Sequence, residues 1–421
     1  MTPAPVQLRE RVSAPLRVED LRAQFPLLSR TMRGKPLVYL DHASTTQKPQ
    51  RVIDAEKRFY ETMNANIHRG VYELSEQATE SYVAAHEAVA RFIGAAGPEE
   101  IIFTRNATEG INLLAWTWGT GQLTRGDHLL LTAMEHHSNI VPWQRVASSR
   151  GASLVFVELM PDGRLDLDDL ERKLKARPKF LSVTHMSNVL GVVNPLQDII
   201  ALARAAGVSV IVDAAQSVPR IPVDVAALGA DFVVFSSHKM YGPTGIGVVV
   251  GKKDLLETME PFLVGGDMVK TVTREGATWN DLPWKFEAGT PNVAGGIALG
   301  EAVHFLSEVG MERVWEHEQD LVAYTLPRLQ NIPGLRLLGP AEAPERGGVF
   351  SFTIEGIHSH DLASFLNEEG IAIRGGHHCA QPLLQSLGLT ECARLSVGIT
   401  TSCEEIDTAL FALRRSIAVL I

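Results

Sequence analysis

Short apolar runs rich in β-branched residues alternate with longer amphipathic segments between about Pro36 and Val250. A short apolar run suits a buried strand, and an apolar period of about 3.6 residues suits a helix packed on one face. The predicted strands are Leu37–Leu40, Ile101–Thr104, His128–Thr132, Ser153–Val157, Phe180–Thr184, Val208–Val212, Phe232–Phe235 and Gly247–Val250. The helical patterns between them include Gln77–Phe92, Ala107–Trp116, Asn139–Ser149 and Pro195–Ala205. This alternation predicts an α/β fold with a mostly parallel sheet.

The pattern changes after about Gly295. A long helical pattern covers Ile297–Leu329, and Pro327 and Pro333 mark its expected end. The later predicted elements are strands Val349–Ile354, Ile371–Arg374 and Ala393–Val397 and helices Asp361–Asn367 and Glu404–Ile417. We therefore expect a large α/β domain over residues 33–295 and a smaller α+β domain made of residues 1–32 with 296–421. The segment Gly266–Pro291 has little periodicity and is predicted to be a functional loop.

The composition is that of an ordinary globular chain, with 45% hydrophobic and 21% charged residues. A net charge of −10 without a basic stripe argues against nucleic acid or an anionic membrane as a partner. No apolar run approaches the roughly 20 residues that span a bilayer, and the N-terminus lacks the apolar core of a secretion signal. Only three cysteines occur, Cys379, Cys392 and Cys403, which favours a reducing compartment over a disulfide scaffold. We expect a cytoplasmic protein.

Lys239 is the first candidate for chemistry, because ligands of such sheets bind beyond the carboxyl ends of the strands. It follows the predicted strand Phe232–Phe235 within Ser236-Ser237-His238-Lys239. Desolvation of its ammonium group is costly, lowers the amine pKa and suits it to form a Schiff base with an aldehyde cofactor. A lysine at a strand end can also simply extend into solvent. Its neighbours therefore decide between the two interpretations.

Asp213 and Gln216 follow another predicted strand. Pyridoxal 5′-phosphate (PLP) withdraws electrons effectively only while its pyridine nitrogen is protonated, and an adjacent carboxylate such as Asp213 maintains that state. Gln216 could reach the phenolic oxygen of the cofactor. The alternative is that Asp213 caps the next helix.

The segment Thr104–Gly110 lies between a predicted strand and a predicted helix. Free backbone N–H groups at the helix start, together with the Thr108 hydroxyl, make an anion site that suits a phosphate group. Asn106 and Glu109 also have the spacing of a capping box, and both interpretations can hold.

Two histidine-containing segments complete the candidate site. His136 follows a strand, where it could stack on a cofactor ring and move protons near neutral pH. Cys379 lies in the glycine-rich segment Arg374–Pro382, where a histidine-flanked thiol can be exposed, mobile and partly ionised. The alternative is a metal site built from Cys379 and the histidines of the two segments, His136, His137, His377 and His378. Because adjacent histidines do not easily face one ion and no zinc motif is present, we expect no metal.

Together these clusters resemble the cysteine desulfurases of the PLP-dependent class V aminotransferase family, specifically the SUF-type (group II) branch. The motifs that carry the resemblance are residues 39–46, 66–70, 213–216, 236–239 and 374–382. The last is the most specific, because the other branch has a longer loop of different sequence. The resemblance implies PLP fold type I (aspartate-aminotransferase-like) and a homodimer with active sites at its interface. It also implies conversion of L-cysteine to L-alanine with a persulfide on Cys379, supplying sulfur for iron–sulfur cluster assembly.

The resemblance further implies a role for each candidate residue. Lys239 would hold PLP and shuttle a proton, His136 would stack on the ring, and Cys379 would attack the substrate sulfur. The expected contacts with the cofactor ring are Asp213, Asn188 and Gln216. The expected contacts with the phosphate are Ala107, Thr108, Ser236 and His238 of the same chain, joined by Thr290 of the partner subunit. The expected substrate contacts are Arg394, whose guanidinium would grip the carboxylate, with Arg374, Asn188 and His68.

Two positions depart from the family pattern. His42 stands where a smaller residue is common, and Thr400-Thr401-Ser402 replaces a Tyr-Asn-Thr run, which suggests altered packing or altered contacts at the substrate's edge. Cys392 and Cys403 have no family role, and we expect both to lie in the core.

His360 matches a position where relatives that use a zinc-containing sulfur acceptor carry histidine. It therefore favours a SufU-like acceptor over a SufE-like one, the alternative being a surface histidine that caps the helix at Asp361. The rival functions are a selenocysteine lyase and a PLP aminotransferase or racemase of the same fold. A non-catalytic metal- or sulfur-binding scaffold is a third, from a different class.

Overall fold

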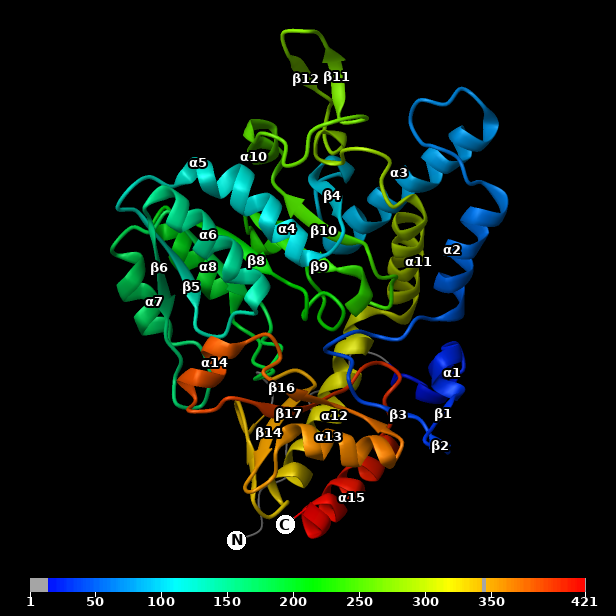
Figure 1. The fold of residues 1–421 in the computed structure, drawn as a ribbon, viewed down its shortest axis with the longest axis vertical. Coiled ribbons are helices and arrows are strands. Elements are labelled where there is room, and N and C mark those ends of the chain that lie inside the picture. Colours follow the sequence, from blue (N-terminus) through cyan, green and yellow to red (C-terminus); the bar gives the residue numbers. More distant parts are fainter. Residues whose placement is uncertain (1–13, 343–345, 421) are drawn as a thin grey trace.

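A seven-stranded sheet forms the centre of the larger part of the protein (Figure 1). The computed structural model describes residues 14–342 and 346–420, so residues 1–13 of the expected small domain lie outside the described residues. The strand order is β4-β10-β9-β8-β7-β5-β6, with β10 antiparallel to both of its neighbours and the other pairs parallel. The strands are β4 (Ile101–Thr104), β5 (His128–Thr132), β6 (Ser153–Val157), β7 (Phe180–Thr184), β8 (Ser209–Asp213), β9 (Phe232–Ser236) and β10 (Gly247–Gly251).

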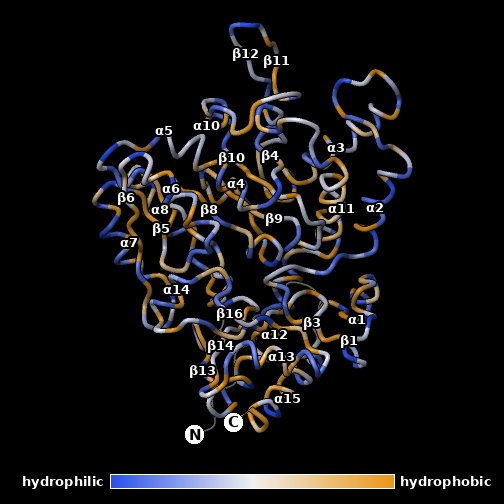
Figure 2. The backbone as a smooth tube through the Cα atoms, in the orientation of Figure 1, coloured by the Kyte–Doolittle hydropathy of each residue, from blue (hydrophilic) through white to orange (hydrophobic). Residues whose placement is uncertain are grey.

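Each strand of this sheet contributes side chains to two separate cores. In β5, Leu130 packs into one core, whereas Leu129 and Leu131 pack into the other. This follows from the two-residue period of a strand, and it explains why apolar side chains occur on both faces of these strands. Figure 2 shows the hydrophobic positions along these strands and the hydrophilic tip of the hairpin formed by β11 (Val269–Val272) and β12 (Ala277–Trp279).

Helices cover both faces of the sheet (Figure 1). One core receives side chains from α3 (Glu73–Ile93), α7 (Leu167–Leu174), α8 (Leu196–Ala205) and α11 (Val293–Val309). The other receives them from α4 (Ala107–Leu114) and α6 (Val141–Arg150). The remaining helices of this part are α2 (Gln50–Thr62), α5 (Thr120–Gln122), α9 (Val225–Leu228) and α10 (Lys253–Thr258).

The smaller part is built on an antiparallel sheet in the order β13-β14-β17-β16. These strands are β13 (Leu335–Leu337), β14 (Val349–Ile354), β17 (Cys392–Ser396) and β16 (Arg374–Gly376). Their apolar face packs against helices α12 (Met311–Gln330), α13 (Ser359–Glu368) and α15 (Cys403–Leu420). Helix α14 (Gln381–Ser386) lies between this sheet and the large part (Figure 1).

The expected single helix Ile297–Leu329 is wrong. It is two helices, α11 and α12, separated by Gly310, whose φ of 86° is incompatible with a continuing helix. Pro327 does not end α12 but lies inside its last turn, where a proline removes only one helical hydrogen bond. The predicted helix Ala107–Trp116 ends earlier, at Leu114, and continues as a π-helical turn over Ala115–Gly119.

The strands near the boundary of the two parts also differ from expectation. The predicted strand Leu37–Leu40 is only β3 (Val38–Tyr39), and it pairs with β15 (Ile371–Ala372), not with the main sheet. The predicted strand Ile371–Arg374 is therefore two strands that belong to different sheets, β15 and β16. The segment Gly266–Pro291 contains the hairpin β11–β12, although it was predicted to be a loop. The pairing of β3 with β15 could not be predicted, because a two-residue strand carries no local signal of a partner that lies far away in the sequence.

A buried ion pair joins the two parts. Arg220, which follows β8, donates from Nη1 to Glu318 of α12 at 2.7 Å and to the Val397 carbonyl at 3.0 Å. Both charged side chains are 4% exposed, so each depends on the other for charge compensation. Glu318 also accepts a bond from the Gly348 N–H.

No helix in the described ranges is both long enough and apolar enough to cross a membrane.

Candidate active site

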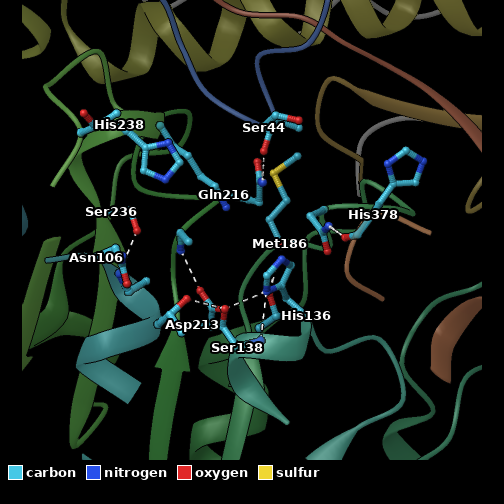
Figure 3. Close-up of a pocket in the computed structure, with 18 of the residues that line it drawn as sticks. Ser44, Asn106, His136, Ser138, Met186, Asp213, Gln216, Ser236, His238 and His378 are labelled. Carbon is cyan, nitrogen blue, oxygen red and sulfur yellow. Dashed lines mark hydrogen bonds between the residues drawn. The ribbon is translucent and has the colours of Figure 1, made fainter. Parts of the chain in front are cut away.

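A cavity of about 380 Å³ opens at the carboxyl ends of β7, β8 and β9, facing the small sheet (Figure 3). Its lining includes eleven of the predicted site residues, namely Ala107, Thr108, His136, Asn188, Asp213, Gln216, Ser236, His238, Lys239, Arg374 and Arg394. Cys379, His68 and Thr290 do not line it. The parallel arrangement of the strands thus gathers residues that lie more than a hundred positions apart in the sequence.

Lys239 and Asp213 are charged groups that face the same cavity. Burial lowers the pKa of the Lys239 amine to about 8, although Asp213 acts in the opposite direction. Burial raises the pKa of the Asp213 carboxyl, which the Ala215 N–H and Lys239 partly offset. A lysine with a pKa near 8 is substantially neutral in mildly basic solution and can attack a carbonyl carbon.

The polar groups of the cavity fit PLP. Gln216 donates to the Ala43 carbonyl at 2.7 Å, but its Oε1 is a buried acceptor without a hydrogen-bond partner among the described residues. Because an unpaired buried acceptor is unfavourable, this oxygen is suited to accept a hydrogen bond from a ligand bound in the cavity. Asp213 uses Oδ1 for a backbone bond to Ala215, which orients the carboxylate toward the cavity. A protonated heterocycle with an adjacent oxygen substituent satisfies both groups.

The start of α4 forms the end of the cavity expected to hold phosphate. Asn106 caps the helix by accepting from the Glu109 N–H at 3.0 Å, whereas the Glu109 carboxylate accepts from the Arg105 N–H. The helix cap is confirmed, and the phosphate site stays a prediction. Ser236 Oγ accepts from the Ala107 N–H, and Thr108 Oγ1 lies 2.6 Å from Ser138 Oγ. Thr108 and Ser236 therefore bring hydroxyl groups to the positive end of the helix.

Burial keeps two histidines of the cavity neutral. It lowers the pKa of His136 to about 3 and that of His238 to about 4, and the nearby Lys239 acts in the same direction. His136 Nδ1 accepts from the Ser138 N–H at 3.1 Å, which fixes the orientation of the ring at the cavity wall (Figure 3). A neutral imidazole can stack on a flat cofactor without adding positive charge.

Two arginines converge on Ser44 on the opposite side of the cavity. Arg394 Nη2 donates to Ser44 Oγ at 2.7 Å and to Asp41 at 3.1 Å, and Arg374 donates to Ser44 Oγ at 3.0 Å. The Arg394 side chain is 1% exposed, and its Nε has no hydrogen-bond partner among the described residues. A buried guanidinium with an unused N–H suits a carboxylate ligand.

Cys379 lies outside the cavity, on the turn between β16 and α14. The preceding residue, His378, lines the cavity, and its carbonyl accepts from Asn188 Nδ2 at 2.9 Å. The Asn188 amide, expected on the cofactor, is therefore bonded to the cysteine loop. The Cys379 N–H donates to His377 Nδ1 at 3.1 Å. The thiol is partly exposed, as expected for a sulfur carrier.

His68 and Thr290 lie close to each other, away from the cavity of their own chain. Thr290 Oγ1 is 3.2 Å from Asn66 Oδ1, and the His68 ring is 4.4 Å from Trp284. The two predicted contacts therefore do not join the other site residues within one chain.

Several lining residues were not singled out from the sequence. They include Ser44, Ser138, Thr184, Met186 and Thr244, whereas His378 was considered only as a ligand of the alternative metal site. Ser44 and Ser138 stand inside motifs that were recognised, and their position just after Asp41 and His136 could have identified them. Met186 and Thr244 carry no such signal, because apolar and small polar residues line many loops.

The two departures from the family pattern meet in one buried place. His42 is 2% exposed and packs against Gly398, where an added Cβ would lie 2.6 Å from His42 Nδ1. Thr401 Oγ1 accepts from the Gly398 N–H at 3.1 Å. The two departures therefore lie together in the core, around Gly398, and their effect on packing or on substrate contacts stays a prediction. Cys392 is buried as predicted, whereas Cys403, at the start of α15, is only partly buried.

A group of potential metal ligands lies on the surface near the cysteine loop. His358, His360 and Glu391 offer ligand atoms within 4.8 Å of one another. His358, not His360, caps α13, because its Nδ1 accepts from the His360 N–H. The interpretation of His360 as the helix cap is therefore wrong, and its exposed ring is not used in capping.

The family profile described as "Aminotransferase class-V" matches residues 38–409. The chain belongs to the class-V aminotransferase family. It is 44% identical over 419 residues to the cysteine desulfurase of Haloferax volcanii, covering 96% of this chain and 98% of that protein. It is 47% identical over 399 residues to the cysteine desulfurase of Cronobacter sakazakii, covering 94% and 98%.

Solved structures agree with this membership. The cysteine desulfurase CsdA of Escherichia coli has a TM-score of 0.89 at 38% identity, covering 97% of this chain and all of that chain. The apo cysteine desulfurase of Thermococcus onnurineus has a TM-score of 0.92 at 37% identity, with the same coverage. The predicted fold class, PLP fold type I, is confirmed.

The pKa of Lys239 can be tested through cofactor uptake. We expect the rate at which the apoprotein binds added PLP to rise with pH through about 8 and then level off, since the neutral amine is the nucleophile. The visible absorbance of lysine-bound PLP measures this rate, and Lys239→Ala, which should show no such band, is the control. A rate that levels off only near the ordinary lysine pKa of 10.5 would contradict the lowered pKa.

Proposed function

We propose that this protein is a PLP-dependent cysteine desulfurase of the SUF type, which converts L-cysteine to L-alanine and carries the sulfur on Cys379. The observation that carries the proposal is the position of Cys379 beside a cavity that holds Lys239 and Asp213. Its neighbour His378 lines that cavity, which places the cysteine loop at the wall of the site. The relatives at 44–47% identity are cysteine desulfurases, and the similarity extends over nearly their whole length, which supports the same activity here.

Different residues of this chain bind the substrate carboxylate and transfer the proton. Arg394, with one N–H unused, holds the substrate carboxylate, and Ser44 and Asp41 keep its guanidinium in place. Bound PLP draws electrons from the α-carbon of the substrate. Lys239 Nζ, whose pKa lies near 8, can take a proton and return it at neutral pH. Neutral His136 closes one face of the cavity.

The sulfur step uses the thiolate of Cys379. Its Sγ attacks the substrate sulfur, so an S–S bond forms on Cys379 as the C–S bond of the substrate breaks. The carbon fragment keeps the electron pair of the C–S bond, gains a proton and leaves as L-alanine. No external oxidant is required, because the sulfur is oxidised as the carbon is reduced. Cys379 must then present its persulfide to an acceptor, which suits its partly exposed position outside the cavity.

Cys379 can be tested directly by mass spectrometry after exposure to L-cysteine. We expect Cys379 to gain the mass of one sulfur atom and Cys379→Ala to lose at least about 99% of cysteine turnover, because it removes the nucleophile. Cys403→Ala, which changes another partly exposed thiol, should keep both properties. Selenide release that survives in Cys379→Ala would favour a selenocysteine lyase. Pyruvate formed from cysteine, without sulfide or persulfide, would favour an aminotransferase.

We also propose that the protein acts as a homodimer in which Thr290 completes the phosphate site of the partner. Thr290 and His68 lie outside their own cavity, as such an arrangement requires. The neighbouring apolar side chains Val71, Tyr72 and Leu74 are exposed, with Val71 at 95%. An exposed apolar group of this kind is typical of a protein interface.

Complementation between two inactive variants tests this arrangement. Thr290→Glu should repel phosphate, and Lys239→Ala cannot hold PLP. If each site uses Thr290 of the partner subunit, co-expression of the two variants should restore about a quarter of the active sites, since half of the dimers are mixed and each has one intact site. Asp213→Asn with Lys239→Ala is the matched control that should restore none. Equal activities in the two mixtures would mean that the site is built within one chain.

The acceptor is proposed to be a zinc-containing, SufU-like protein rather than a SufE-like one. His360 is exposed, and its ring lies against Gly376, at the start of the cysteine loop. A Cβ added to Gly376 would lie 3.4 Å from His360 Nε2. An imidazole there can bind the metal of an acceptor that docks over Cys379. We further propose that the transferred sulfur serves iron–sulfur cluster assembly in the cytoplasm.

We expect His360→Ala to slow sulfur transfer to a zinc-containing acceptor about tenfold, the effect of losing one ligand-type contact. Persulfide formation on Cys379 should not change, because His360 does not line the cavity. His304→Ala, an exposed histidine of α11, is the control. Unchanged transfer in His360→Ala would overturn the assignment of the acceptor class.

A further inference from the structure

The turn that carries Cys379 has an uncommon backbone conformation. His378 and Cys379 have positive φ angles of 50° and 55°, which residues with a Cβ rarely adopt. Two such residues in succession persist only where surrounding contacts hold them. The conformation of Cys379 therefore depends on groups outside the turn.

His137, which follows β5 in the large part, makes two of these contacts. Its backbone N–H donates to the Cys379 carbonyl at 2.8 Å. Its ring Nε2 accepts from the Gln381 N–H at 3.1 Å. Gln381 is the first residue of α14, and the first N–H groups of a helix have no partner within it. His137 thus binds the chain at Cys379 and again two residues later.

The ring contact fixes the protonation state of His137. The Gln381 N–H is the donor, so Nε2 must offer a lone pair and the ring must be neutral, with its proton on Nδ1. Burial is the largest cause of a lowered pKa of His137, and the lowered pKa favours this neutral form. The His377 ring lies 5.8 Å away and accepts the Cys379 N–H from within the turn.

The other contacts hold the preceding residue. Asn188 donates to the His378 carbonyl at 2.9 Å, and His378 Nε2 lies 2.9 Å from the Cys392 carbonyl. These bonds position His378 at the cavity wall. Within the described residues, the bonds from the large part to Cys379 and Gln381 come from His137.

We propose that His137 is a positioning residue that holds Cys379 at the mouth of the cavity. Its backbone and ring hold the chain at the Cys379 carbonyl and at the Gln381 N–H that follows, so that the thiol keeps one orientation while substrate is bound. The consequence for sulfur transfer depends on the proposed function, whereas the restraint on the turn does not.

His137→Phe removes the ring acceptor but keeps the aromatic bulk and the backbone N–H. We expect amide hydrogen exchange at Gln381 to rise roughly five- to tenfold, as for the loss of one ordinary hydrogen bond. Alkylation of Cys379 by iodoacetamide should accelerate severalfold, because the turn opens more often. In cysteine turnover, kcat should fall while KM changes little, since His137 does not line the cavity.

His137→Gln is the informative counterpart, because its side-chain oxygen can accept the Gln381 N–H at a similar reach. We expect it to restore exchange and alkylation to within about twofold of the parent protein. His304→Phe, at an exposed position of α11, controls for the added aromatic ring. If His137→Phe does not fold, His137→Asn removes the acceptor with a side chain too short to reach.

Unchanged exchange and unchanged alkylation in a folded variant without the acceptor would overturn the proposal. Failure of His137→Gln to restore them would do the same, since the ring bond would then not be the cause. Both measurements use the protein without substrate. A protein that does not turn over cysteine would therefore disprove the proposed function while leaving this test intact.

Discussion

The guanidinium of Arg394 joins three segments that are far apart in the sequence. From β17 it donates to Asp41 and Ser44 in the N-terminal segment and to the Asn188 carbonyl after β7. The guanidinium is almost fully buried and is not hydrated, so each of these bonds offsets part of the free energy lost on desolvation. Together with the Arg220–Glu318 ion pair, these bonds hold the small sheet above the strand ends, where the cavity lies between the two parts.

Burial shapes the chemistry of this cavity more than any single charge. Desolvation is the largest cause of the pKa shifts of Lys239, Asp213 and His136. It makes the amine less basic, the carboxyl less acidic and the imidazole neutral. The same low polarity that shifts these groups also strengthens the attraction between Asp213 and Lys239. A buried site of this type can thus bind a charged cofactor and still offer a neutral nucleophile.

The sequence predicted the large sheet and the residues at its strand ends well. Strands such as His128–Thr132, with three successive leucines, have an apolar centre and are bounded by loops, so local pattern defines them. Lys239 and Asp213 could be found because each directly follows such a strand. The split of the expected long helix had a local signal in Gly310 that the apolar pattern alone did not reveal, whereas the pairing of β3 with β15 could not be found because it is decided by distant packing. The orientation of the Asn188 amide toward the cysteine loop is likewise set by tertiary contacts.

The contact between His42 and Gly398 limits how this sequence can change. Any side chain at residue 398 would collide with the buried imidazole, so His42 is compatible only with glycine there. A substitution at Gly398 therefore requires the buried imidazole to move, and a smaller residue at position 42 would relieve the collision. The two positions, 356 residues apart in the sequence, are thus coupled sterically, and a change at one alters which residues the other can hold.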